Sequence, residues 1–147
     1  EGGGVHAMYT EAEIVNCTIV GNRAAQGGGT ADGTLKNCIV YDNEAHDMAS
    51  ANYVGGSFAY SCTTPRPAGT GNISNAPEFV PGTDELAWNS PCVNAGSNAY
   101  TVGAWDLAGT NRILFGTVDM GCYECTVPEP ASVIVIIAVL LSVRRHV

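Results

Sequence analysis

Lysine is almost absent from this 147-residue chain: Lys36 is the only one, and lysine and arginine together number six. A protein that binds nucleic acid needs clustered basic side chains for the phosphates. The formal net charge of −8 therefore argues against a nucleic-acid partner. The same acidity keeps a protein soluble and leaves loose Ca²⁺ binding as a lesser alternative. No other cofactor and no defined metal site is predicted.

Strong helix formers are also scarce, which disfavours a helical domain. Glycine occurs 18 times, about twice its usual share. Together with frequent asparagine, threonine and valine, this composition favours short strands joined by many turns. The sequence thus predicts an all-β fold.

The chain begins at Glu1, without an initiator methionine or a basic and then apolar leader. Because an exported protein needs such a leader, we expect the sequence to be the later part of a longer or processed protein. Export is suggested by the six cysteines, since an even number is typical of disulfides in an oxidising compartment. Six cysteines allow fifteen pairings, and sequence alone does not choose among them.

A repeat runs through the first part of the chain. Residues 16–22 (Asn-Cys-Thr-Ile-Val-Gly-Asn) match residues 37–43 (Asn-Cys-Ile-Val-Tyr-Asp-Asn) at an offset of 21 residues. A glycine triplet at 2–4 recurs at 27–29, offset by 25, and residues 57–62 form a looser copy whose cysteine follows that of the second copy by 24. Periods of this length indicate a solenoid, and short strands with glycine and asparagine turns are typical of parallel β-helix coils.

Equivalent residues of stacked coils lie above one another, so repeated asparagines can chain their amides and bind turn backbone groups. The residues expected in such ladders are Asn22, Asn43, Asn16, Asn37, Cys17 and Cys38. The two cysteines could form a small apolar stack, which we favour, or a disulfide. Two and a half coils bury too little to be stable alone, which also suggests coils upstream of Glu1.

The repeat ends near Pro65, where prolines and glycines become frequent. We expect three parts: coils over 1–64, an irregular cap over the open end of the solenoid at 65–126 (the cap), and a tail at 127–147. Arg112 would pair with Asp106 or Asp119 and lock the cap.

Four cysteines lie just before the cap or within it. A disulfide between Cys62 and Cys92 would staple it. Cys122 and Cys125 have a spacing that suits zinc or redox chemistry, but no second ligand pair or redox fold accompanies them. Structural disulfides are therefore the prediction for this pair too.

Several blocks in the second half resemble the C-terminal region of exported right-handed β-helix proteins of the choice-of-anchor Q kind. The matching blocks are 60–62, 72–80, 90–96, 106–113 and 118–124. The resemblance implies a right-handed parallel β-helix on the cell surface with a variable anchoring tail. It implies no defined activity.

The tail closely resembles a PEP-CTERM sorting signal. Its elements are Pro128, Glu129 and Pro130, an apolar run at 131–143, and the basic pair Arg144 and Arg145. The resemblance implies recognition by an exosortase-type processing enzyme. A run of thirteen residues makes about 20 Å of helix, short of a bilayer core of roughly 30 Å, so membrane contact through 131–143 is transient or permanent according to processing.

No catalytic set stands out in the coils. Asp42 aligns with Gly21 and Glu44 with Arg23, so stacked carboxylates of the kind that polysaccharide lyases and hydrolases need are not seen. We expect an exported structural, adhesive or matrix-associated protein at the surface of a Gram-negative-type bacterium. The alternatives are a polysaccharide lyase or hydrolase with its active site in upstream coils, or a carbohydrate-binding module that stacks extracellular polysaccharide on tyrosines such as Tyr53 and Tyr60.

Overall fold

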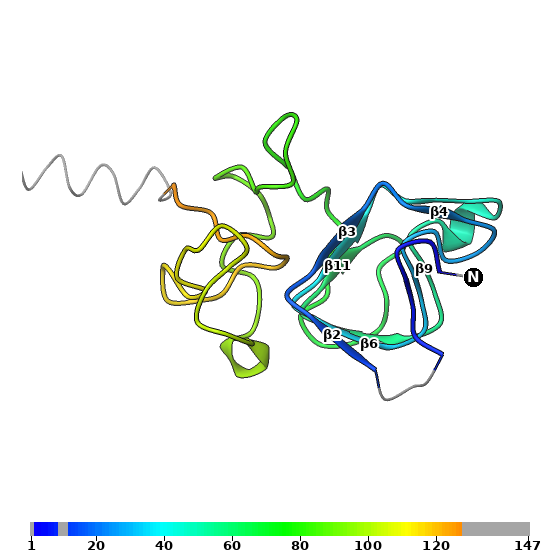
Figure 1. Cartoon of the computed structure of the whole chain (residues 1–147), viewed down its shortest axis with the longest axis horizontal. Coiled ribbons are helices and arrows are strands. Elements are labelled where there is room, and N and C mark those ends of the chain that lie inside the picture. The colour runs from blue at the N-terminus through cyan, green and yellow to red at the C-terminus, as the bar shows by residue number, and fades with distance from the viewer. Residues whose placement is uncertain (1, 9–11, 128–147) are drawn as a thin grey trace, which may run out of the picture.

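The computed structural model describes residues 2–8 and 12–127, and short parallel strands dominate its first half (Figure 1). The elements in chain order are β1 (Val5–His6), β2 (Glu13–Val15), β3 (Thr18–Val20), β4 (Arg23–Ala24), β5 (Thr30–Ala31), β6 (Thr34–Lys36), β7 (Ile39–Tyr41), β8 (Glu44–Ala45), the 3₁₀ helix η1 (Met48–Ser50), β9 (Tyr53–Val54), β10 (Ser57–Ala59), β11 (Cys62–Thr63) and the 3₁₀ helix η2 (Asn98–Tyr100). Helix within the described ranges is thus limited to two single turns.

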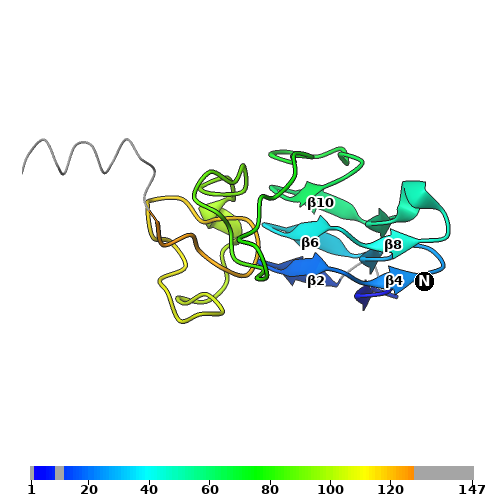
Figure 2. The same ribbon diagram turned by 90° about the horizontal axis from the view of Figure 1, so that it is seen from above.

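The strands form four small sheets, and every pairing between them is parallel. The strand orders are β1-β5-β9, β10-β6-β2, β11-β7-β3 and β4-β8. Consecutive strands belong to different sheets, so the chain winds round and returns to each sheet one coil later, as the stack of β2, β6 and β10 shows (Figure 2). The stacked parallel strands confirm the all-β prediction and are compatible with a parallel β-helix.

The register supports two of the three predicted offsets. Thr18 pairs with Ile39 at an offset of 21 residues, and Val5 pairs with Thr30 at 25. The third is wrong by one residue, because Cys62 pairs with Ile39 at 23 instead of lying over Cys38. Packing explains the shift.

In the neighbouring sheet, Phe58 lies over Leu35, which lies over Ile14. This apolar stack fixes the last coil at 23, and the register carries into β11. Ser61 then takes the place expected for Cys62, and Cys38 N donates to Ser61 Oγ at 3.1 Å.

The glycine triplets stand where two coils touch. A Cβ on Gly28 would clash with the backbone carbonyls of Glu44 and Ala51, and a Cβ on Gly29 would lie 2.7 Å from Asn43 Nδ2. The repeat at 2–4 and 27–29 therefore follows from close backbone approach, which excludes any side chain.

The cap, residues 65–126, is described throughout and holds only η2 and isolated bridges, such as Phe79 with Leu86. Its first residues run over the last coil, where Ile73 forms a bridge with Cys62. The rest lies along the side of the coils, not over their end (Figures 1 and 2).

Strand β7 is buried on both faces as a result. Val40 points into the coil interior, in a cluster with Ile19, Leu35, Cys38 and Phe58. Ile39 points outward into a second cluster, whose other buried members are Cys62, Leu86, Cys92, Met120 and Cys125. The second cluster is the apolar contact between coils and cap, and its formation explains why β7 reads as a continuous apolar run.

Candidate functional site

An amide chain runs along one corner of the coils. Asn43 Oδ1 accepts from Asn22 N at 2.9 Å and from Asn22 Nδ2 at 3.1 Å. Asn43 Nδ2 donates to the carbonyls of Ile19 and Tyr41, both at 2.9 Å. Asn22 and Asn43 thus lie one above the other and bind turn carbonyls that strand pairing leaves free.

Asn52 extends this chain, although no repeat marks it. Its Oδ1 accepts from Asn43 N at 3.1 Å, and its Nδ2 donates to Thr64 O at 2.9 Å. It comes from the next turn of the chain, nine residues after Asn43. A search for repeats at a fixed offset does not find Asn52, because only its side chain, and not its backbone, lies at the next position of the ladder.

Asn16 and Asn37 do not form a ladder; their side chains bind the backbone of the cap. Both have left-handed backbone, with φ of 51° and 52°, and the third coil repeats this corner at Tyr60 with φ of 48°. Asn37 exchanges two hydrogen bonds with the backbone of Ser97: Nδ2 donates to the carbonyl at 2.9 Å, and Oδ1 accepts from the N–H at 2.8 Å. Asn16 Oδ1 accepts from Val102 N at 3.4 Å. These corners dock the cap onto the coils.

Cys17 and Cys38 lie in adjacent coils, and the side chain of each affects the pKa of the other. The neighbouring Cys38 side chain lowers the pKa of half-buried Cys17 to about 7, whereas burial raises the pKa of Cys38. Cys38 Sγ also donates to Ile14 O at 3.3 Å. The arrangement is a stack of free thiols.

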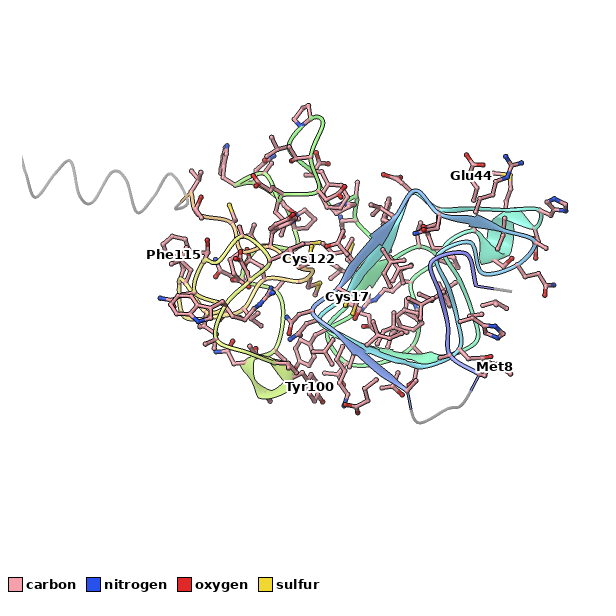
Figure 3. The ribbon with its side chains drawn as sticks, in the orientation of Figure 1. Met8, Cys17, Glu44, Tyr100, Phe115 and Cys122 are labelled. Carbon is pink, nitrogen blue, oxygen red and sulfur yellow. The ribbon has the colours of Figure 1, made fainter. Side chains whose placement is uncertain are left out.

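All six cysteines are free thiols in the structure, including the four predicted to form disulfides. Cys62 and Cys92 nevertheless interact through their side chains inside the coil–cap cluster. Cys125 is buried near them, and its thiol contacts Val127 O at 3.6 Å. Cys122 is half-buried, and its N–H donates to Thr18 Oγ1 at 3.1 Å, across the boundary between coils and cap, near which Figure 3 labels Cys17 and Cys122.

Four charged side chains are buried within the cap: Asp106, Arg112, Asp119 and Glu124. Arg112 Nη1 lies 3.5 Å from Glu124 Oε1, so the expected pairing with Asp106 or Asp119 is wrong. Arg112 also donates to the carbonyls of Gly121 and Cys122, both at 3.1 Å.

The aspartates bind backbone N–H groups. Asp119 accepts from Asn94 N at 2.7 Å and from Cys125 N at 2.6 Å. Asp106 accepts from Thr110 N at 2.7 Å and Glu124 N at 2.8 Å. Turn amides of the cap thereby occupy both carboxylates.

Three acids with one arginine leave excess negative charge in a buried place. Burial, followed by the neighbouring Asp119, raises the pKa of Glu124 to about 7 against the opposing effect of Arg112. Burial also raises the pKa of Asp119. A protonated Glu124 is therefore stable near neutral pH.

A small hollow of about 130 Å³ lies beside these acids, lined in part by Glu85, Asp106, Tyr123 and Glu124. Over residues 2–8 and 12–127, no group of three His, Cys, Asp or Glu side chains is arranged to hold a metal ion. After β7, Asp47 caps η1 by accepting from Ala49 N at 3.0 Å, and Glu44 lies 3.6 Å from Arg23 Nε.

In the part of the chain that the structure describes, the exposed aromatic side chains are tryptophan and phenylalanine, not the tyrosines expected to stack on sugars. Tyr53 packs on Phe58 and Tyr60 on Tyr100. Trp105 is 63% exposed and Phe115 48%. Phe115 lies on the side of the cap that faces away from the coils (Figure 3). Residue type alone does not separate such loop positions from core positions.

The predicted sorting residues lie outside the described ranges, namely Pro128, Glu129, Pro130, Arg144, Arg145 and the apolar run 131–143. Among the described residues, no helix has the length and apolar character needed to cross a membrane.

Three comparisons with known proteins found no match: no family model, no curated protein and no solved structure matches the chain.

Proposed function

We propose that this chain is the C-terminal part of an exported cell-surface protein with a structural, adhesive or matrix-associated role, built as a right-handed parallel β-helix and sorted by its tail. The observation that carries the proposal is the stacking of parallel coils by backbone pairing and buried amides. Such a stack makes a stiff rod whose ordered side chains serve structure.

The polar groups described above support this role, because most of them form hydrogen bonds or ion pairs with other groups of the same molecule. Asn43, Asn37 and Asp119 each bind several backbone groups, and Arg112 pairs with Glu124. A catalytic or sugar-binding surface needs convergent polar groups that face solvent. The buried groups instead hold the coils and the cap together.

In this proposal, the tail is the signal that sorts the protein to the cell surface. Pro128, Glu129 and Pro130 are recognition residues for an exosortase-type enzyme, and the run 131–143 contacts the membrane before processing. Arg144 and Arg145 remain on the cytoplasmic side.

The test is expression of the full-length gene in a bacterium that carries such an enzyme. We expect intact cells to expose the protein to an external protease and the mature chain to lack the mass of the tail. Glu129→Ala should leave the tail uncut, whereas Ser132→Ala, in the same tail but outside the motif, should be processed normally. Equal processing of both variants would overturn the sorting role, and polysaccharide cleavage by the full-length protein would favour the lyase or hydrolase alternative.

A further inference from the structure

Two cysteines meet at the centre of the contact between coils and cap. Cys62 is in β11, Cys92 is in the cap, and both are fully buried. The two side chains belong to one buried cluster, and the neighbouring Cys62 thiol raises the pKa of Cys92. Around them lie the buried side chains Ile39 and Met120, so the pair sits in an apolar cluster.

Their neighbours hold the pair in place. Cys92 N donates to Ser90 Oγ at 3.1 Å, and Cys92 O accepts from Met120 N at 3.0 Å. Cys62 N donates to Cys38 O at 2.8 Å within the coil ladder. Both backbones are therefore fixed independently of the thiols.

We propose that Cys62 and Cys92 form a disulfide that ties the cap to the last coil. In the reaction, the two thiols lose two protons and two electrons, one S–S bond forms, and an organic disulfide such as oxidised glutathione is reduced to two thiols. The weak contact of Cys62 Sγ with Asn75 O, at 3.2 Å, is given up because the sulfur no longer carries a proton.

The pair Cys17 and Cys38 is a weaker candidate for such a bond. Those two cysteines lie in adjacent coils that parallel strand pairing already joins, as between Thr18 and Ile39. Cys62 and Cys92 instead join β11 to a cap that has few regular backbone pairings of its own. A covalent link therefore constrains the unfolded chain at a place where the ladder does not.

Burial determines when the bond forms. Neither sulfur is accessible to an oxidant in the folded protein, so we infer that oxidation occurs while the cap is still open. Once formed, the bond is shielded from reductants in the same way.

The experiment is refolding of the full chain from denaturant with reduced and oxidised glutathione, followed by alkylation and non-reducing peptide mapping. We expect the peptides of Cys62 and Cys92 to be cross-linked, and the folded, reduced protein to acquire this link at least about tenfold more slowly. Alkylated Cys62 and Cys92 after oxidative refolding, or a link from either to another cysteine, would overturn the proposal.

Stability gives a second readout. The link should raise the Tm by on the order of 10 °C between reducing and oxidising conditions. Cys62→Ala and Cys92→Ala should each abolish that difference, and Cys122→Ala, which changes a half-buried cysteine outside the pair, should retain it. A difference that survives in Cys92→Ala contradicts the assignment. The result is independent of the proposed surface role, since the bond can form in a protein with any function.

Discussion

At the residue scale, the stability of the coils depends on a few buried amides. Each coil corner leaves carbonyl groups that no neighbouring strand reaches, and these must find donors. The side chain of Asn43 donates to two such carbonyls, and its Oδ1 accepts from Asn22. It is the centre of the chain that begins at Asn22 and ends at Asn52.

Asn43→Ala should therefore destabilise the protein by about 2–4 kcal/mol, because the carbonyls of Ile19 and Tyr41 lose their buried partner. Asn22→Ala, at the half-exposed end of the chain, should cost only about 1 kcal/mol. Urea unfolding of both variants measures the difference. Equal losses would mean that the amide chain does not act through burial.

At the element scale, the register of the coils comes from packing more than from residue identity. The offset of 21 was predictable because the matched asparagines of the first two coils share one backbone corner, at Asn16 and Asn37. The offset of 23 for the last coil was not, because Phe58 must lie on Leu35 to fill the interior. A matching cysteine is a weaker signal than a bulky apolar side chain.

The glycine triplets give a sharper element-scale prediction. Gly28→Ala places a methyl group against the carbonyls of Glu44 and Ala51, which are backbone and cannot move aside. We expect a loss of about 3 kcal/mol or more. Gly82→Ala meets no atom within 4 Å and carries only its positive φ of 81°, so its cost should be about 1 kcal/mol.

Thermal or urea unfolding of the two glycine variants decides whether close approach sets the repeat. If Gly28→Ala were as stable as Gly82→Ala, the coil contact at the triplet would be looser than described. The repeat at 2–4 and 27–29 would then reflect turn conformation alone.

At the scale of the whole molecule, the docking of the cap was the part that the sequence could not predict. Asn37 and Ser97 are 60 residues apart, and Thr18 and Cys122 are 104 apart. No periodicity connects such pairs, because the cap is not a coil. The sequence did suggest an ion pair for Arg112, but Glu124 and not an aspartate is its partner, since both aspartates already bind backbone N–H groups.

The buried acids of the cap should make the stability of the molecule depend on pH. The pKa of Glu124 is raised to about 7 in the folded protein, against an ordinary value of 4.5. The folded state then holds a proton that the unfolded state has released. This stabilisation is complete below about pH 4.5 and is lost as the pH rises through about 7, and Asp119, whose pKa is also raised, acts in the same direction.

We expect the free energy of unfolding to fall by about 3 kcal/mol between pH 4.5 and pH 8. Glu124→Gln keeps the neutral form at every pH and should remove most of this fall, whatever it does to the stability itself. Glu78→Gln, on an exposed side chain, should leave it unchanged. Urea titrations at several pH values measure the slopes. A slope that persists in Glu124→Gln would place the titrating group on Asp119, whose pKa burial also raises.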